Sequence, residues 1–401
     1  MRPRVVVTGL GVVSSIGIGW RSFWASLIAG RSGIRPVRYL DTAEFPTHAG
    51  GEVEGFDPAP FMPMPVARRL GRGAQFAIAA AAQAVQDAKL TGPGLSQARA
   101  GICLGTTMAD VQALETVHSA WIAHRRLSAR LLMQYPGFTM SATVAAHFGL
   151  EGRALMIPTA CAAGNYALAY AADLLRLEKA DLMLAGGAEP FSRIVFTGFN
   201  RLLAVAPERC QPFDRNRKGM LVGGGAAILV LERLEDARAR HAPIYAEVLG
   251  YGMSCDANHM TIPHSEGVQQ VMARALQDVG LAPTDVDYIN AHGTGTLAND
   301  QTEAHAIRAV FGSHADHLPV SSIKSMLGHA MGAASALEAV ACVLAVREDR
   351  VPPTVNFETP DPECPVDCVP NVSRAHRVRV ALNNSFAFGG NNACVAFGKV
   401  S

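Results

Sequence analysis

The chain alternates between short apolar runs rich in β-branched residues and longer stretches in which apolar and small residues recur with helical spacing. Arg4–Thr8 is the first short run, and it predicts a buried strand that leads into a glycine-rich segment. The alanine-rich stretch Ala74–Ala88 predicts a helix, which a turn at Thr91–Gly94 connects to a strand at Gly101–Leu104. Strands and helices in this alternation indicate an α/β fold with buried sheets.

The same order of predicted elements occurs twice along the chain. In the first half, a helix at Gln75–Lys89 precedes a strand at Ala100–Leu104. In the second half, a helix at Val268–Val279 precedes a strand at Val286–Asn290. Internal similarity of this kind indicates two related halves.

A second pair of matching segments follows in each half. A turn opens the helix Ala162–Leu177, and a turn with similarly small residues opens the helix Ala330–Val346. Each half then closes on an apolar strand, Ala226–Leu231 in the first and Ala393–Phe397 in the second. The repeat therefore extends over most of the chain.

The charged stretch Asp236–Pro243 separates the two halves. We predict an N-terminal half of residues 1–242 and a C-terminal half of residues 243–401. Pseudo-twofold packing of two such halves would bring equivalent loops together, so a site shared between the halves is expected.

Cys161 is the candidate nucleophile. It follows a predicted strand at Ala154–Ile157 and lies where a helix of small residues begins. At a helix N-terminus, the dipole and the unpaired N–H groups favour a thiolate, and small neighbours leave room for a substrate. A buried structural cysteine is the alternative for any single cysteine.

Two histidines lie on glycine-containing loops at the ends of predicted elements. His292 lies in Asn290–Thr296, directly after a strand, and His329 ends the segment Lys324–His329, directly before a helix. Two imidazoles near one thiol can polarise a carbonyl and stabilise an enolate. Either histidine alone could instead cap a helix or pack in the core, but the two together favour a catalytic role.

The order of these segments resembles the motifs of the β-ketoacyl-carrier-protein synthases, and most closely those of the type II elongating enzymes. The resemblance covers nearly the whole chain. The matching segments are Arg4–Gly11, the turn at Cys161, Pro212–Asp214, His292–Thr296, Lys324–His329 and Asn384–Gly390. The resemblance implies a thiolase-like α/β fold with duplicated αβαβα halves in five layers.

The resemblance also implies a reaction, the decarboxylative Claisen condensation of an acyl thioester on Cys161 with malonyl-acyl carrier protein. The backbone N–H groups of Cys161 and Phe388 would form the oxyanion hole. His292 and His329 would polarise the malonyl thioester, promote loss of the carboxylate and stabilise the enolate. Whether carbon dioxide or bicarbonate leaves is not settled by the resemblance.

Further residues take supporting roles by the same resemblance. Lys324 would pair with Glu338 and tune the field around His329. The substrate-binding residues, from the phosphopantetheine arm to the acyl tunnel, would be Thr294, Thr296, Asp256, Thr261 and Met108. The acidic carrier protein would dock on Arg68, Arg69 and Arg72. No separate cofactor or metal is expected, because phosphopantetheine arrives on the carrier protein.

Some segments depart from the family pattern. Ala387 replaces the first glycine of the usual Gly-Phe-Gly-Gly loop, and its β-carbon restricts φ, so the gating motion of Phe388 is expected to differ. The segment Gly219–Gly225 lacks the usual acidic residue. Leu297–Asp300 and Val351–Thr354 resemble nodulation-type and polyene-type specialised synthases, so fatty acid biosynthesis and specialised acyl or polyene biosynthesis both remain open.

Composition narrows the possible partners and compartments. Of 401 residues, 49% are apolar and 17% are charged. The formal net charge is +1, so the overall electrostatic potential does not favour nucleic acid or a membrane as a partner. No segment approaches the roughly 20 apolar residues that span a bilayer. Eight scattered cysteines fit reduced thiols in a cytoplasmic protein, and Cys364 and Cys368 lack a second pair with zinc-ligand spacing.

Three other interpretations are less favoured. Thr8–Gly11 suggests a dinucleotide-binding loop, but the third glycine comes late, at Gly17. A degradative thiolase would need a second catalytic cysteine where this chain has Ala387. A chain-length-factor subunit, an inactive homologue that shapes its partner's pocket, would lack the nucleophile. The chain is expected to form a homodimer, or a heterodimer with such a subunit.

Overall fold

One mixed sheet runs through the molecule. The computed structural model describes residues 2–90, 95 and 99–400, and the predicted turn at Thr91–Gly94 lies outside the described residues. The strand order is β11-β10-β14-β15-β9-β1-β8-β7-β5-β6, and β2 pairs with β1. β1 and β9 pair only over Val5–Val7 and Ala246–Val248, so a short join links two half-sheets, one from each half of the chain.

The elements follow the predicted repeat, with η marking 3₁₀ turns. In the N-terminal half they are β1 (Val5–Ser14), β2 (Gly17–Ile18), α1 (Trp20–Ile28), β3 (Arg35–Pro36), β4 (Ala49–Gly50), α2 (Met64–Ala67), α3 (Arg72–Asp87), β5 (Ala100–Gly105), α5 (Val111–Ile122), α6 (Ala129–Leu132), α7 (Phe138–Phe148), β6 (Ala154–Ile157), η1 (Ala160–Ala162), α8 (Ala163–Arg176), β7 (Leu182–Glu189), α9 (Arg193–Arg201), β8 (Gly225–Arg233) and α10 (Leu234–Ala239). In the C-terminal half they are β9 (Ala246–Cys255), α11 (Ser265–Val279), η2 (Pro283–Asp285), β10 (Tyr288–Asn290), α12 (Leu297–Phe311), η3 (Gly312–Asp316), β11 (Val320–Ser321), α13 (Lys324–Leu327), η4 (Met331–Ala333), α14 (Ala334–Glu348), β12 (Arg350–Val351), β13 (Arg374–Ala375), β14 (Val380–Phe386) and β15 (Asn391–Gly398). The predicted division at residue 242 falls between α10 and β9.

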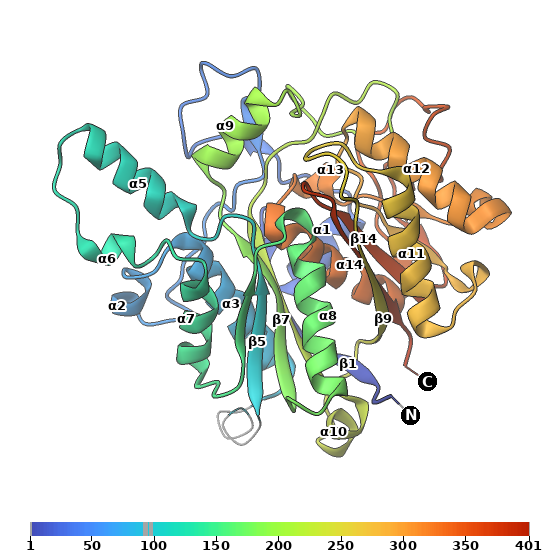
Figure 1. Cartoon of the computed structure of the whole chain (residues 1–401), viewed down its shortest axis with the longest axis horizontal. Helices are drawn as coiled ribbons and strands as arrows, with labels where there is room; N and C mark the ends of the chain where they lie inside the picture. Colours follow the sequence, from blue (N-terminus) through green and yellow to red (C-terminus); the bar gives the residue numbers. More distant parts are fainter. Residues whose placement is uncertain (1, 91–94, 96–98, 401) are drawn as a thin grey trace.

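Helices form three layers around the two half-sheets. α3 packs on β1 and β8 from outside, and α11 packs on β9 and β15 from the opposite outside. α8 and α14 lie between the half-sheets, since α8 contacts both β7 and β15 and α14 contacts both β14 and β8 (Figure 1). The order of layers is helix, sheet, helix, sheet, helix, which confirms the predicted five-layer architecture with duplicated halves.

The inner helices pack backbone against backbone. α14 is buried at every position from Ala334 to Val346. A β-carbon at Gly164 in α8 would lie 2.6 Å from the backbone nitrogen of Ala336 in α14, so only glycine permits this approach. The two inner helices therefore hold the turns at their N-termini in a fixed relation.

β1 is longer than the predicted strand, because it continues past Thr8 to Ser14. Its glycines do not end the strand, since α3 packs directly on them. A β-carbon at Gly11 would lie 1.8 Å from the carbonyl oxygen of Ala80. All ten residues of β1 are buried, as expected for a strand covered on both faces.

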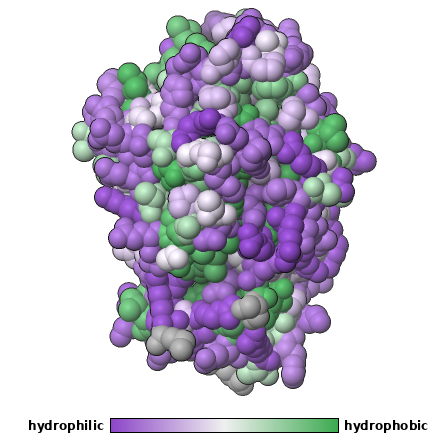
Figure 2. Space-filling model, turned by 90° about the vertical axis from the view of Figure 1, so that its right-hand side faces the viewer, coloured by the Kyte–Doolittle hydropathy of each residue, from purple (hydrophilic) through white to green (hydrophobic). Residues whose placement is uncertain are grey.

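The outer surface is more polar than this interior. Figure 2 shows a largely hydrophilic face over the C-terminal half, broken by smaller apolar patches. Within the described part of the chain, no helix is both long enough and apolar enough to cross a membrane.

Candidate active site

Cys161 lies in η1, the 3₁₀ turn between β6 and α8. Ala160 before it has a φ of 49°, so the chain bends sharply from strand to helix at this point. The thiol is only 6% exposed and lines a pocket between the halves. Ser385 Oγ in β14 donates a hydrogen bond of 2.9 Å to the carbonyl oxygen of Cys161, which ties the turn to the C-terminal half.

His329 lies opposite Cys161, between α13 and η4. Its Nε2 is 3.1 Å from Cys161 Sγ. The backbone N–H of Met331 donates to His329 Nδ1 at 3.2 Å. Because Nδ1 accepts a hydrogen bond, a neutral His329 carries its proton on Nε2, the atom that faces the thiol.

His292 follows β10 and is held by two buried side chains. Glu303 in α12 accepts hydrogen bonds from the N–H groups of His292 and Gly293, at 2.9 and 2.8 Å. Lys324 Nζ lies 3.4 Å from His292 Nδ1 and donates to the His292 carbonyl at 2.7 Å. An ammonium group is only a donor, so Nδ1 accepts and the Nε2 of His292 carries the proton.

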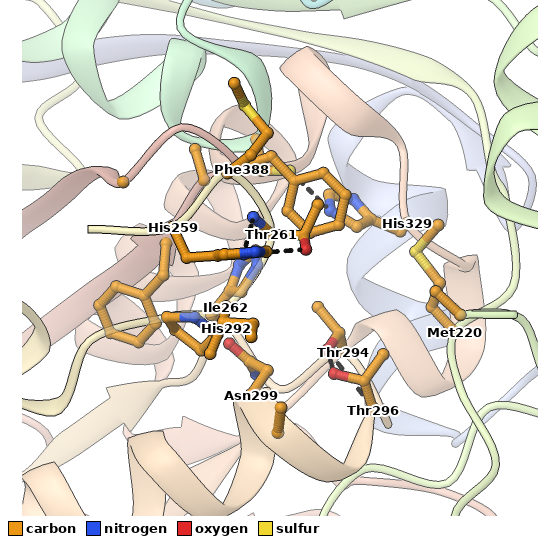
Figure 3. Close-up of a pocket in the computed structure, with 18 of the residues that line it drawn as sticks. Met220, His259, Thr261, Ile262, His292, Thr294, Thr296, Asn299, His329 and Phe388 are labelled. Atoms are coloured by element: carbon orange, nitrogen blue, oxygen red, sulfur yellow. Dashed lines mark hydrogen bonds between the residues drawn. The ribbon is translucent and has the colours of Figure 1, made fainter. Parts of the chain in front are cut away.

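The two imidazoles converge on the pocket, as Figure 3 shows, with ring centroids 5.5 Å apart. Burial lowers the pKa of both His292 and His329 well below the usual range, and the nearby Lys324 cation lowers both further. Both rings are therefore neutral near pH 7 and present Nε2–H donors. Neutral donors of this kind polarise a carbonyl without giving up a proton.

Lys324 and Glu338 form the predicted ion pair, and both side chains are buried. Lys324 also donates hydrogen bonds to His292, and its cation lowers the pKa of His329, so it acts electrostatically on both imidazoles. Glu338 Oε2 has no hydrogen-bond partner among the described residues. Burial raises the pKa of Glu338, while the Lys324 cation opposes that rise.

The electrostatics of Cys161 also differ from the sequence-based expectation of a favoured thiolate. Burial raises the pKa of the Cys161 thiol to about 11. Lys324 and the backbone N–H groups of Phe388 and Cys161 act in the opposite direction without reversing the shift. The resting site therefore holds a thiol, which must lose its proton as it attacks.

The backbone N–H groups of Cys161 and Phe388, which come from two different loops, both act on the Cys161 sulfur by lowering its pKa. Phe388 lies in the turn between β14 and β15, where the Gly390 N–H donates to the Ala387 carbonyl at 2.9 Å. The Phe388 ring lies 5.5 Å from the ring of Phe199. This arrangement brings together the two donors that the sequence predicted for an oxyanion hole.

Comparison with known proteins agrees with this geometry. The family profile "Beta-ketoacyl synthase, N-terminal domain" matches residues 2–237, and the profile "Beta-ketoacyl synthase, C-terminal domain" matches residues 245–358. The chain belongs to the beta-ketoacyl synthase family. The predicted family is therefore confirmed.

Relatives of this synthase match over their full lengths. It is 42% identical to 3-oxoacyl-[acyl-carrier-protein] synthase 2 of Synechocystis sp., covering 99% of this chain and 98% of the relative. It is 40% identical to nodulation protein E of Rhizobium sp. strain N33, covering all of both chains. The solved ishigamide ketosynthase/chain length factor is 43% identical, with a TM-score of 0.96 and full coverage of both chains. A solved type II polyketide ketosynthase in complex with its acyl-carrier protein is 33% identical, with a TM-score of 0.92 and full coverage of both.

Four predicted substrate-binding residues line the synthase's pocket. Thr294 and Thr296 lie side by side on one wall (Figure 3), with their hydroxyl oxygens 2.9 Å apart. Asp256 and Thr261 lie on the loop after β9. The Asp256 carboxylate accepts hydrogen bonds from Asn392 Nδ2 at 2.7 Å and from the His264 N–H at 3.1 Å. Asp256 thus holds its loop against β15.

Met108 lies outside the set of residues that line this pocket. It is partly buried and packs on an apolar cluster that contains Phe191 and Phe196. Its backbone N–H donates to Glu189 at 2.9 Å. A role for Met108 in bounding an acyl tunnel stays a prediction.

The three predicted docking arginines lie in different environments. Arg68 and Arg69 are exposed. The Arg72 guanidinium instead lies 4.7 Å from the ring centroid of Phe56 and 4.9 Å from that of Phe76. Burial lowers the pKa of Arg72. Arg72 is therefore less available to an acidic partner than its sequence position suggests.

Cys161, His292 and His329 place three potential metal-ligand atoms within 4.8 Å of one another. The surroundings disfavour a metal ion there. A ligating imidazole normally donates its other N–H to an acceptor, whereas the Nδ1 atoms here face the Met331 N–H and the Lys324 ammonium. The three side chains fit acyl chemistry better than metal ligation.

Sequence reasoning missed several residues that shape the site. Glu303 holds the His292 loop, and Phe199, Met220 and Asn299 line the pocket. A signal for Glu303 was present, because it lies three residues after Asp300, so the two acidic side chains share a face of α12. Phe199 carried no comparable signal, since its contact with Phe388 depends on the tertiary fold.

Proposed function

We propose that this synthase condenses an acyl group on Cys161 with malonyl-acyl carrier protein to give 3-oxoacyl-acyl carrier protein. The observation that carries the proposal is the approach of His329 Nε2 to within 3.1 Å of Cys161 Sγ, with a second neutral imidazole beside it. The assignment to a 3-oxoacyl-carrier-protein reaction is supported by relatives of that name at 41–42% identity.

The first half-reaction loads the enzyme. Cys161 Sγ attacks the carbonyl carbon of an acyl thioester on the carrier protein, and the carrier's sulfur leaves with the proton that the thiol gives up. The negative charge on the tetrahedral oxygen is held by the N–H groups of Cys161 and Phe388, both of which lower the pKa of the Cys161 thiol in the resting enzyme. The products are the Cys161 thioester and the free carrier thiol.

The second half-reaction forms the carbon–carbon bond. The Nε2–H groups of His292 and His329 bind the malonyl thioester oxygen, and the bond to the carboxylate breaks with its electron pair moving into the enolate. The enolate carbon attacks the Cys161 thioester, the carbon–sulfur bond breaks, and Sγ takes a proton to restore the thiol. Lys324 keeps the Nδ1 of His292 unprotonated throughout.

Two partners accompany this proposal. The acyl carrier protein brings its phosphopantetheine arm to Thr294 and Thr296, and its acidic surface to Arg68 and Arg69. Among the solved relatives is a ketosynthase in complex with its acyl-carrier protein.

A second subunit is the other proposed partner, either another copy of this chain or a chain-length-factor-like homologue. β6 ends the described sheet at one edge. Nearby, α5 and α6 stand out from the body in Figure 1. These helices, the segment that follows α6 and the start of α7 carry large exposed apolar side chains, which are Trp121, Ile122, Leu132, Met133 and Phe138. An exposed apolar surface of this kind is typical of a subunit interface.

Mass spectrometry of the protein after exposure to a panel of acyl carrier protein thioesters tests the chemistry. We expect one acyl group, attached at Cys161, and carbon dioxide release when malonyl-acyl carrier protein follows. A chain that acquires no acyl group would instead act as an inactive partner subunit.

Sedimentation of the protein alone, and of a Trp121→Glu/Phe138→Glu variant, tests the subunit interface, because the variant should sediment as a monomer.

A further inference from the structure

Glu189, the last residue of β7, is a fully buried carboxylate that takes no part in the half-reactions above. Its Oε1 accepts the N–H of Met108 at 2.9 Å. Its Oε2 accepts the Thr107 N–H, the Thr106 hydroxyl at 3.0 Å and the Gly332 N–H at 3.3 Å. Three of these donors belong to the loop after β5, and the fourth belongs to η4, the turn beside His329.

The turn that supplies the fourth donor is the counterpart of the Cys161 turn. η1 and η4 are both three-residue 3₁₀ turns that open an inner helix, and their first residues have φ values of 49° (Ala160) and 48° (Met331). Counting from these residues, Gly332 stands where Cys161 stands. The N–H at this position serves the oxyanion in the first turn and a carboxylate oxygen of Glu189 in the second.

We propose that Glu189 is a positioning residue for the condensation: its carboxylate occupies the anion position of the second turn and so fixes both the His329 turn and the Thr106–Met108 loop. The inference rests on the proposed function of Cys161 and His329. The link to His329 is short, because the Met331 N–H that sets the His329 tautomer directly precedes the Gly332 N–H bound by Glu189.

The main chains around Glu189 are closely packed. A β-carbon at Gly332 would lie 2.3 Å from the carbonyl carbon of Thr106, and one at Gly187 would lie 2.5 Å from the Gly332 carbonyl oxygen. The main chains of β7, the loop after β5 and the turn η4 therefore meet at contact distance, and a single carboxylate accepts hydrogen bonds from both the loop and the turn. An acceptor with two oxygens suits four converging donors.

Glu303 offers a matched comparison within the same protein. It is also a buried carboxylate, and it accepts two backbone N–H groups of the His292 loop and the Asn384 amide at 3.3 Å. Burial raises the pKa of Glu189 and of Glu303 to about 7 in each case. The two residues therefore share burial and the direction of the pKa shift, but they hold different loops.

The test compares Glu189→Gln with Glu303→Gln in the full-length protein. The amide nitrogen would face N–H donors, so each variant loosens the loops that its carboxylate holds. For Glu189→Gln we expect carbon dioxide release from malonyl-acyl carrier protein to fall about tenfold. We also expect the ratio of Cys161 acylation rates for long and short acyl chains to change. For Glu303→Gln we also expect carbon dioxide release to fall, but the ratio of acylation rates for long and short acyl chains should stay unchanged.

Two controls keep the outcome decisive. Thr106→Val removes one donor to Glu189 at nearly constant volume and should change the acyl ratio in the same direction if Glu189→Gln does not fold. A folded Glu189→Gln protein with wild-type carbon dioxide release and an unchanged acyl ratio would overturn the positioning role. Absence of acylation at Cys161 in the wild-type protein would contradict the proposed function instead, so the two failures are distinguishable.

Discussion

The turns η1 and η4 have the same backbone form but different chemistry. Each begins with a residue at a φ near 50° and leads into an inner helix. The first turn carries a thiol at its second residue, Cys161, and the N–H of that residue lowers the pKa of the thiol. The second carries Gly332 there, and its N–H is bound by Glu189. Duplication supplied two similar turns, and only one is open to a substrate.

The difference shows how one fold can divide catalysis between its halves. The N-terminal turn supplies the nucleophile, while the segment before the C-terminal turn supplies His329, 3.1 Å from it. Main chain fills the place where a second nucleophile would lie, since a β-carbon at Gly332 would meet Thr106 and Thr107.

Replacing the nucleophile tests the first turn most directly. Cys161→Ser should abolish condensation, because a hydroxyl near neutral pH is a far weaker nucleophile than sulfur. Cys161→Gln should abolish acylation yet keep malonyl decarboxylation, since the amide resembles the acylated enzyme. Carbon dioxide release and condensation product are measured side by side. A folded glutamine variant that releases no carbon dioxide would contradict the role of the two histidines.

The pH dependence of Cys161 alkylation tests how burial acts on the first turn. Burial raises the pKa of this thiol to about 11, so the reactive thiolate is a small fraction at pH 7. The alkylation rate with iodoacetamide should rise about tenfold per pH unit above pH 7 and continue past the pKa of roughly 8.5 of a free cysteine. Peptide mass spectrometry follows the modification. A rate that is constant from pH 6 upward would indicate a thiolate in the resting enzyme.

Gly332→Ala makes the second turn more like the first. The added β-carbon would lie 2.3 Å from backbone atoms of Thr106, so the loops must move apart, at a cost of about 1–3 kcal/mol in the free energy of unfolding. Gly198→Ala is the matched control, because a β-carbon there meets nothing within 4 Å. Denaturant unfolding of both variants measures the difference. Equal stabilities would show that the second turn tolerates a side chain.

The smallest effect concerns the carrier protein. Arg68→Glu/Arg69→Glu should raise the KM for carrier-bound substrate severalfold in a salt-dependent way, because both side chains are exposed. Arg72→Glu should lower stability instead, since that guanidinium packs on Phe56 and Phe76. Small thioester mimics serve as the control substrate. If the double variant lost activity equally on both substrate types, these arginines would have no docking role.

The sequence predicted the residues that carry the chemistry and the repeat that positions them. Cys161, His292 and His329 were identifiable because each lies at the end of a recognisable element. The five layers were implied by the family resemblance, which agreed with the duplicated pattern. The contacts that hold the site were not identifiable. Which imidazole Lys324 contacts depends on tertiary distances of 3–4 Å, and an acidic residue at the end of a strand, such as Glu189, usually indicates a solvent-exposed turn.

Some predictions from local sequence failed because a distant element changed the environment. Arg72 lies among basic residues in the sequence, but two phenylalanine rings cover it in the fold. The dipole argument for a Cys161 thiolate did not include the burial imposed by the opposite half. The glycines of β1 suggested a strand end, but α3 uses them for close packing.

The complete burial of α14 has a consequence for how the protein folds. From Ala334 to Val346 this helix has no side that faces solvent, unlike a typical surface helix with one polar face. Both half-sheets are therefore needed to cover it. The C-terminal half alone would expose one side of this apolar helix to water and would tend to aggregate. The two halves should therefore unfold in a single cooperative transition.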